Sequence, residues 1–264
     1  MKALRPLFLI VSLILMVGLA CSFGGSSSNA TDEPTAVQDE PTEVVDEPTA
    51  EEEPTAEEEP TAEEPTEEPV AEAQEYYTET FDGNLDNYTY FNTGKGDEDK
   101  MKLETKDGAL VFDLKGENLW IYVTYNPFTY TDVALEVTAD NRGKNTNDIS
   151  LLCRYNEDEG WYEFNVKNSG LYSILAYDAT GIVKEGYNTI YNGASTAVKQ
   201  GRDINTYTAS CVDDKLTLTI NGKEVKSIKD TKFRFRDGKV GFSVSSYNVL
   251  PILVNVDSFT ISQP

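Results

Sequence analysis

The sequence has no histidine among its 264 residues, and positive charge is scarce, with 22 Lys and Arg against 46 Asp and Glu. Histidine is the commonest general base and a frequent metal ligand. Its absence excludes Ser-His and Cys-His nucleophile pairs and every His-ligated metal site in this chain. Because acidic residues exceed basic ones, we expect no basic surface that could bind the phosphates of a nucleic acid, and therefore no nucleic-acid partner.

Basic residues are missing altogether from residues 22–75, which hold 19 acidic residues. This segment repeats an acid-Pro-Thr unit, as in Asp32-Glu-Pro-Thr-Ala and Glu59-Pro-Thr-Ala. It has little apolar surface to bury and cannot recover the entropy lost on folding, so we expect a disordered, extended linker. A spacer between a membrane and a domain fits this position. Low-complexity drift and an acidic tail that binds a cation or a partner are the alternatives.

Long apolar runs are confined to residues 1–21, where Leu7 to Ala20 follow a short cationic start. This run is shorter than a membrane span of about 20 residues and has the length of a signal-peptide core. Its end, Gly18-Leu-Ala-Cys21, resembles the lipobox of bacterial lipoproteins, in which the cysteine is lipidated. We therefore expect Cys21 to anchor the chain in a membrane, outside the cytoplasm. Plain secretion after an ordinary signal-peptidase cut is the alternative, because the lipobox prefers leucine where Gly18 stands.

Residues 76–264 are predicted to form one all-β domain. Apolar residues alternate with polar ones in many short segments, such as Val133-Ala-Leu-Glu-Val-Thr, and turn residues separate the segments. Asn221-Gly222 lies between two such segments and predicts a two-residue hairpin turn, in which both residues need a positive φ. We expect a two-sheet antiparallel sandwich of the jelly-roll type.

Six segments of this domain resemble the concanavalin A-like lectin and glucanase jelly rolls. They are Leu151-Leu-Cys-Arg-Tyr, Trp161-Tyr-Glu-Phe, Leu171-Tyr-Ser-Ile, the stretch from Tyr207 to Lys223, Gly238-Lys-Val-Gly-Phe and Val256-Asp-Ser-Phe-Thr-Ile. Their order is most similar to bacterial domains of the laminin G-like and 3-keto-disaccharide-hydrolase-like groups. The resemblance covers nearly all of residues 78–262. It is specific for the fold and weak for function, because this fold carries enzymes, lectins and structural modules.

The resemblance brings a possible glycoside-processing activity with it, but the sequence favours a domain without catalysis. Retaining glucanases of this fold place acids at alternate positions of one strand, so that two carboxyl groups lie about 5–5.5 Å apart. Glu163 has Trp161 and Asn165 as its same-face neighbours, which is not such a pattern. Glu157-Asp158-Glu159 is contiguous and is typical of a solvated loop.

Alternation predicts a ligand-binding face. We expect Ile149, Leu151, Cys153 and Tyr155 to face the core on one strand, and Tyr162, Phe164 and Val166 on the next. The residues predicted to point outward together are Arg154, Trp161, Glu163, Asn165 and Tyr177. Aromatic rings for stacking and polar groups for edge contacts are what a glycan or polysaccharide requires. The alternative is that Trp161 only packs against its neighbours.

The strand order implied by the resemblance brings two cysteines, Cys153 and Cys211, into one sandwich core. A disulfide between them suits an oxidising compartment, and two buried thiols are the alternative. Glu79, Asp82 and Asp257 lie near the two ends of the domain, where many carbohydrate-binding jelly rolls hold a structural calcium ion. Ordinary turn and strand-end roles are the competing interpretation for these three acids.

The sequence therefore predicts a lipoprotein that displays a carbohydrate-binding or adhesion domain at the cell surface, with the membrane and a glycan as its partners. A glycoside-processing enzyme of the 3-keto-disaccharide-hydrolase-like type and a purely structural surface domain are the alternatives.

Overall fold

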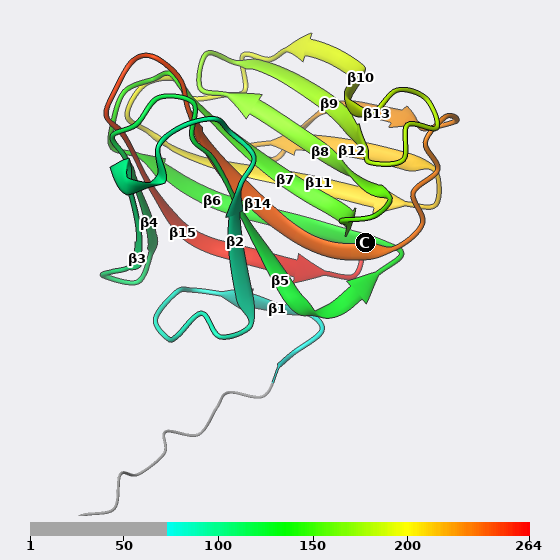
Figure 1. Cartoon of the computed structure of the whole chain (residues 1–264), viewed down its shortest axis with the longest axis horizontal. Helices are drawn as coiled ribbons and strands as arrows, with labels where there is room; N and C mark the ends of the chain where they lie inside the picture. Colours follow the sequence, from blue (N-terminus) through cyan, green and yellow to red (C-terminus); the bar gives the residue numbers. More distant parts are fainter. Residues whose placement is uncertain (1–72) are drawn as a thin grey trace, which may run out of the picture. The chain divides into compact units, whose positions relative to one another are not determined.

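The computed structural model of the protein describes residues 73–264 (Figure 1). The predicted signal segment, Cys21 and residues 22–72 of the predicted linker lie outside the described residues. The described part forms fifteen strands and one short 3₁₀ helix, η1 (Glu98–Lys100). No helix in this part is long and apolar enough to cross a membrane.

The strands form two antiparallel sheets. In order across the first sheet, the strands are β13 (Lys223–Lys229), β12 (Lys215–Ile220), β11 (Ile204–Val212), β6 (Val133–Asn141), β15 (Ile252–Ser262), β4 (Leu110–Leu114) and β3 (Met101–Thr105), with β1 (Tyr77–Glu79) also pairing with β15. In the second sheet they are β10 (Gly186–Ala194), β9 (Leu171–Asp178), β8 (Gly160–Lys167), β7 (Asn147–Asn156), β14 (Gly238–Ser246), β5 (Trp120–Tyr130) and β2 (Tyr88–Asn92). The predicted two-sheet sandwich is confirmed.

The core lies between the two sheets and is built from one side of each strand. Phe242 of β14 packs against Phe259 of β15, with ring centroids 5.0 Å apart, and both side chains are fully buried. Burial of each such side chain contributes about 1.5–3 kcal/mol. Tyr162, Phe164 and Val166 of β8 face this core, as alternation predicts.

The predicted disulfide is confirmed. Cys153 of β7 is bonded to Cys211 of β11, so the covalent link joins the second sheet to the first through the core. The predicted hairpin turn is also present. Asn221 and Gly222 have φ values of +49° and +75°, and they connect β12 to β13.

A bulge near the end of β7 overturns two predicted side-chain directions. Arg154 has a φ of +55°, and the register with both neighbouring strands shifts around it. One extra residue in a strand reverses the alternation beyond it. Tyr155 therefore leaves the core side and packs on the outer surface near Trp161, while Arg154 turns toward the edge of the sandwich. Gly238 lies opposite the bulge, and a Cβ atom there would come within 2.4 Å of the Arg154 backbone.

Candidate functional site

The outer face of the second sheet, which points away from the core, carries a second hydrophobic cluster. Its buried members are Tyr122 of β5, Leu152 of β7 and Trp161 of β8. We call this group the outer aromatic cluster. Trp161 stacks on Tyr177, with centroids 4.1 Å apart and planes 12° apart, and only 4% of its surface is exposed.

Trp161 is therefore not the open stacking platform that alternation alone predicts. It does point outward, but aromatic rings from β5, β7, β9 and β10 surround it. The alternative interpretation of Trp161, packing against its neighbours, describes the geometry, and Tyr177 is part of the same packing. Which strands supply these rings depends on sheet order and register.

Glu163 lies beside this cluster and is almost entirely buried, with 3% of its surface exposed. Ser150 donates a hydrogen bond to its Oε1 at 2.7 Å. The hydroxyls of Tyr122 and Tyr187 lie 3.0 and 3.1 Å from its Oε2, and 2.8 Å from each other. Each tyrosine hydroxyl donates to Oε2 and Ser150 donates to Oε1, so both carboxyl oxygens have hydrogen-bond donors.

Burial raises the pKa of Glu163 above its ordinary value, and the hydrogen bonds from Ser150, Tyr122 and Tyr187 offset only part of that increase. Burial, together with the nearby Glu163 carboxyl, also raises the pKa of Tyr122 and Tyr187. The surroundings of this site therefore favour the protonated form of all three groups more than water does.

A cavity of about 270 Å³ opens over Glu163, and we call it the outer cavity. Apolar and aromatic parts of its wall come from Trp120, Tyr122, Leu175, Tyr187 and Tyr247, and polar parts come from Asp148, Glu163, Asn165, Lys167, Ser173 and Ser245. Two of the five residues predicted for ligand binding, Glu163 and Asn165, therefore line one cavity. Asn165 donates a hydrogen bond to the Ser150 hydroxyl at 3.1 Å.

The far end of the outer cavity holds a second acid that the sequence analysis missed. Asp148 is buried, accepts a 2.6 Å hydrogen bond from the Tyr247 hydroxyl, and has the Lys167 ammonium 3.8 Å away. Alternation contained the signal, because Asp148 precedes the inward-facing Ile149. Trp120 also lines this cavity, and its buried indole nitrogen has no hydrogen-bond partner within residues 73–264.

The two acids of the outer cavity lie at opposite ends of it. Asp148 pairs with Lys167, four positions beyond Glu163 on β8. At about 3.3 Å per residue, their backbone positions are roughly 13 Å apart along the sheet. That separation does not match the close carboxyl pair of a retaining glycosidase. The arrangement instead offers apolar walls, the Asp148 acceptor and the Lys167 donor, which suits a polyhydroxylated ligand.

The other predicted site residues lie elsewhere. Arg154 donates from Nε to the Thr131 carbonyl and from Nη1 to the Phe235 carbonyl, both at 2.9 Å, so it does not share the outer face with Glu163. The bulge at Arg154 is the cause. Glu157-Asp158-Glu159 is an exposed turn between β7 and β8, as expected.

The three acids proposed for calcium do not form one site. Glu79 accepts a hydrogen bond from its own chain at Phe81, and Asp82 accepts one from Thr80. Asp257 lies near Asp140, where burial and that neighbouring acid raise its pKa. Within residues 73–264, no group of three or more Cys, Asp or Glu side chains is arranged to hold a metal ion. Glu79 and Asp82 are engaged by neighbouring residues of their own segment, and the described structure does not bring the three acids together as predicted.

Comparison with known proteins adds a family and a fold. Residues 76–250 match the family described as the 3-keto-alpha-glucoside-1,2-lyase-like domain. No curated protein sequence matches the chain.

Among solved structures, a Bacillus licheniformis beta-glucanase is 12% identical with a TM-score of 0.54, over 73% of this chain and 100% of its own. A glycoside hydrolase family 16 endo-glucanase from Bacteroides ovatus is 10% identical with a TM-score of 0.53, over 70% and 99%. A Bacillus subtilis protein with a galectin-like fold is 10% identical with a TM-score of 0.54, over 71% and 94%. These likenesses establish the fold alone, and they confirm the expected concanavalin A-like jelly roll.

Proposed function

The chain belongs to the 3-keto-alpha-glucoside-1,2-lyase-like family of carbohydrate-related jelly-roll domains, and from that premise we propose that its outer cavity binds a saccharide without cleaving it. The single observation that carries this proposal is the composition of the cavity. Trp120 and Tyr247 provide apolar ring surface, while Asp148, Asn165 and Lys167 provide hydrogen-bonding groups around the same space of about 270 Å³. Sugars present an apolar ring face and polar edges, which is the complement of this wall.

A binding screen with the full chain tests the proposal. Trp161 is unsuitable for substitution, because it is buried and its removal would disturb the outer aromatic cluster. Trp120→Ala is the better variant, since Trp120 is only partly buried and lines the cavity. Aromatic stacking contributes on the order of 1 kcal/mol, so we expect the variant to bind a saccharide at least about fivefold more weakly.

Tyr90→Ala is the matched control. Tyr90 is 59% exposed on β2 of the same sheet and does not line the outer cavity. Its removal should leave affinity unchanged. If no saccharide binds the parent protein in a broad screen, or if the Trp120 variant binds as tightly as the parent, the proposed site is wrong.

A second candidate function is glycoside processing, and one observation favours it. Burial raises the pKa of Glu163, which lines a cavity that Asp148 also lines. A buried acid with a raised pKa is suited to protonate a leaving group. Incubation of the protein with 3-keto-glucosides and glucans, followed by product analysis, separates the two functions. Turnover that disappears in Glu163→Gln would establish the enzyme and refute the non-catalytic proposal.

We also propose that the domain is displayed outside the cytoplasm, at the cell surface, by a lipid on Cys21 and the acidic linker. The apolar run before Cys21 and the Pro-Thr-Glu repeat after it support this location. Cys21→Ser should release the protein from the membrane fraction into solution. Retention of the variant in the membrane fraction would contradict the lipid anchor.

A further inference from the structure

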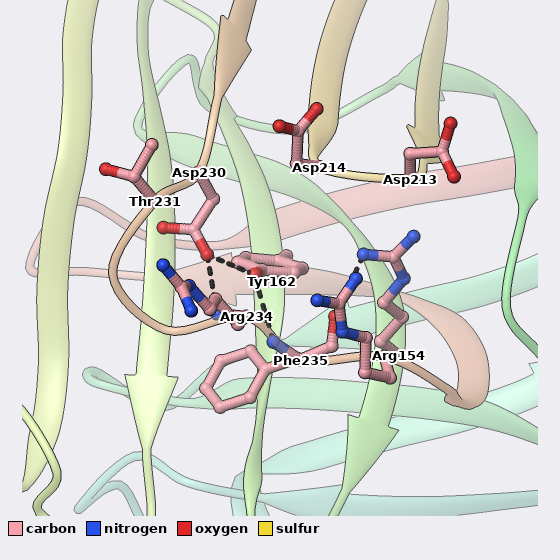
Figure 2. A pocket seen from close by; sticks show the side chains of 9 residues that line it. Arg154, Tyr162, Asp213, Asp214, Asp230, Thr231, Arg234 and Phe235 are labelled. Carbon is pink, nitrogen blue, oxygen red and sulfur yellow. Dashed lines mark hydrogen bonds between the residues drawn. The ribbon is translucent and has the colours of Figure 1, made fainter.

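A second cavity of about 200 Å³ lies at the edge of the sandwich, and we call it the edge cavity (Figure 2). The turn between β11 and β12 supplies Asp213 and Asp214. The segment between β13 and β14 supplies Asp230, Thr231, Arg234, Phe235 and Arg236. Arg154 and Tyr162 come from the second sheet. The edge cavity lies apart from the outer cavity, and no residue lines both.

Three residues that line the edge cavity have a left-handed backbone. The φ values of Arg154, Asp213 and Arg234 are +55°, +49° and +57°. Such a conformation costs on the order of 1 kcal/mol for a residue other than glycine, and it persists only where the surrounding structure holds it. Because three residues with this conformation line one small cavity, the shape of the cavity depends on these held backbone positions and does not follow from regular strand geometry.

Several groups of the edge cavity hold it in place and are not available to a ligand. Asp230 Oδ2 accepts hydrogen bonds of 2.6 Å from the Tyr162 hydroxyl and from the Arg234 backbone N–H, as Figure 2 shows. Burial alone would raise the pKa of Asp230, but these bonds and those from neighbouring N–H groups lower it, so the carboxylate stays ionised. Arg154 is occupied by backbone carbonyls, and Asp214 pairs with Lys229.

Four other side chains of the edge cavity make no hydrogen bond or ion pair with any residue in the described part of the chain. They are the guanidinium groups of Arg234 and Arg236, the carboxylate of Asp213 and the hydroxyl of Thr231. All four residues are exposed. Phe235, which is 7% exposed, adds an aromatic surface between the two arginines in sequence.

The chemistry of these free groups selects a ligand class. A guanidinium fork binds a carboxylate through two parallel hydrogen bonds, so two free arginines favour an anionic group. The Asp213 carboxylate accepts hydrogen bonds from hydroxyl groups, and the Thr231 hydroxyl both donates and accepts. The Asp213 carboxylate also disfavours a compact multivalent anion such as phosphate. A neutral sugar would leave the guanidinium groups without their preferred partner. The volume is below the roughly 300–1,000 Å³ of pockets for drug-sized ligands, which suits one sugar unit.

We propose that the edge cavity binds a carboxylate-bearing sugar unit, of the uronic acid kind, with its carboxylate on Arg234 and Arg236 and its hydroxyls on Asp213 and Thr231. This site goes beyond the saccharide site of the outer cavity and does not depend on it.

Calorimetric titration of the full chain with glucuronate and galacturonate tests the proposal. Arg234→Gln combined with Arg236→Gln should weaken uronate binding by at least about tenfold, because charge-assisted hydrogen bonds are lost. Lys102→Gln combined with Lys115→Gln is the matched control. It removes the same charge from exposed residues of β3 and the segment after β4, and binding should change by less than about twofold.

Ligand controls separate the carboxylate from the sugar. Glucose and the methyl ester of glucuronate should each bind at least about tenfold more weakly than glucuronate, and acetate should not replace it. Asp213→Asn should weaken uronate binding less than the double arginine variant does. Polygalacturonate tests whether a unit within a chain is recognised as well as a free one.

The proposal is overturned if the parent binds no uronate, or if neutral sugars or acetate bind the parent as tightly as uronate does. It is also overturned if the double arginine variant binds uronate as tightly as the parent, or if the double lysine variant loses as much affinity as the double arginine variant. The Trp120→Ala variant should bind uronate like the parent. If it does not, the acidic sugar occupies the outer cavity and the edge cavity is not its site.

Discussion

Removal of the Cys153–Cys211 disulfide should destabilise the domain by an amount that the chain topology sets. The bond closes a loop whose ends are 58 residues apart, and both cysteines are fully buried. In the chain-entropy model, a cross-link over a loop of this length lowers the entropy of the unfolded state by about 14 cal/mol/K, or about 4 kcal/mol at 25 °C. Typical domains have a total free energy of unfolding of only about 5–15 kcal/mol, so this is a large share.

Guanidinium unfolding of the oxidised and reduced protein measures the effect directly. The reduced parent keeps both sulfur atoms, so its loss of about 4 kcal/mol reports the cross-link with little change in core volume. The Cys153→Ala, Cys211→Ala double variant should lose somewhat more, because the two deleted sulfurs leave small cavities in the core. Comparison of the two samples separates the cross-link from the packing.

The prediction is contradicted if the reduced parent unfolds at the same denaturant concentration as the oxidised protein. It is also contradicted if reduction lowers the free energy of unfolding by less than about 1 kcal/mol. Either result would mean that the unfolded chain retains contacts between the β7 and β11 regions, so that the bond restricts little. A loss seen only in the double variant would assign the effect to packing.

Two further predictions concern buried acids. Because the pKa of Glu163 is raised in the folded state, its contribution to stability is present below about 4.5 and is lost as pH rises. The free energy of unfolding of the parent relative to Glu163→Gln should therefore fall between pH 4 and 7 in urea unfolding, and a difference that does not change with pH would contradict the assignment. Because the pKa of Asp230 is lowered in the folded state, its ionised form stabilises the domain above the unfolded-state value of about 3.9 and loses this effect as pH falls. Asp230→Asn should therefore destabilise by about 1–3 kcal/mol at pH 7 and much less near pH 3, and an equal loss at both would refute the ionic role.

The sequence predicts the fold well because its signals are local. Period-two alternation marks the strands, and Asn221-Gly222 marks a turn whose two residues both adopt positive φ. Cys153 and Cys211 fall on inward positions, which alternation and the strand order implied by family resemblance together identify. These features need no knowledge of register.

The candidate site is less predictable because it depends on register and on one irregular residue. Arg154 has a left-handed backbone near the end of strand β7, and the sequence does not indicate this because Gly, Asn and Asp are the usual residues in that conformation. The bulge moves Arg154 to the edge cavity and Tyr155 to the outer face. Burial of Trp161 likewise depends on how the rings of four other strands, β5, β7, β9 and β10, are aligned beside it. Asp148, by contrast, follows from simple alternation.

Glu163 is the feature that folding explains least. A sheet face that points away from the core is stable with ordinary polar side chains, yet here a carboxyl is buried with three hydroxyl donors around it. Burying such a group costs free energy that its hydrogen bonds at best offset, and apolar replacements of buried polar groups are often neutral or stabilising. The group is, however, well placed to set the polarity of the outer cavity, because its raised pKa favours the neutral form at that end while Asp148 and Lys167 form an ion pair at the other. A cavity with one neutral and one ionic end orients a ligand that has an apolar face and polar edges, and this ties Glu163 to binding more closely than to the fold.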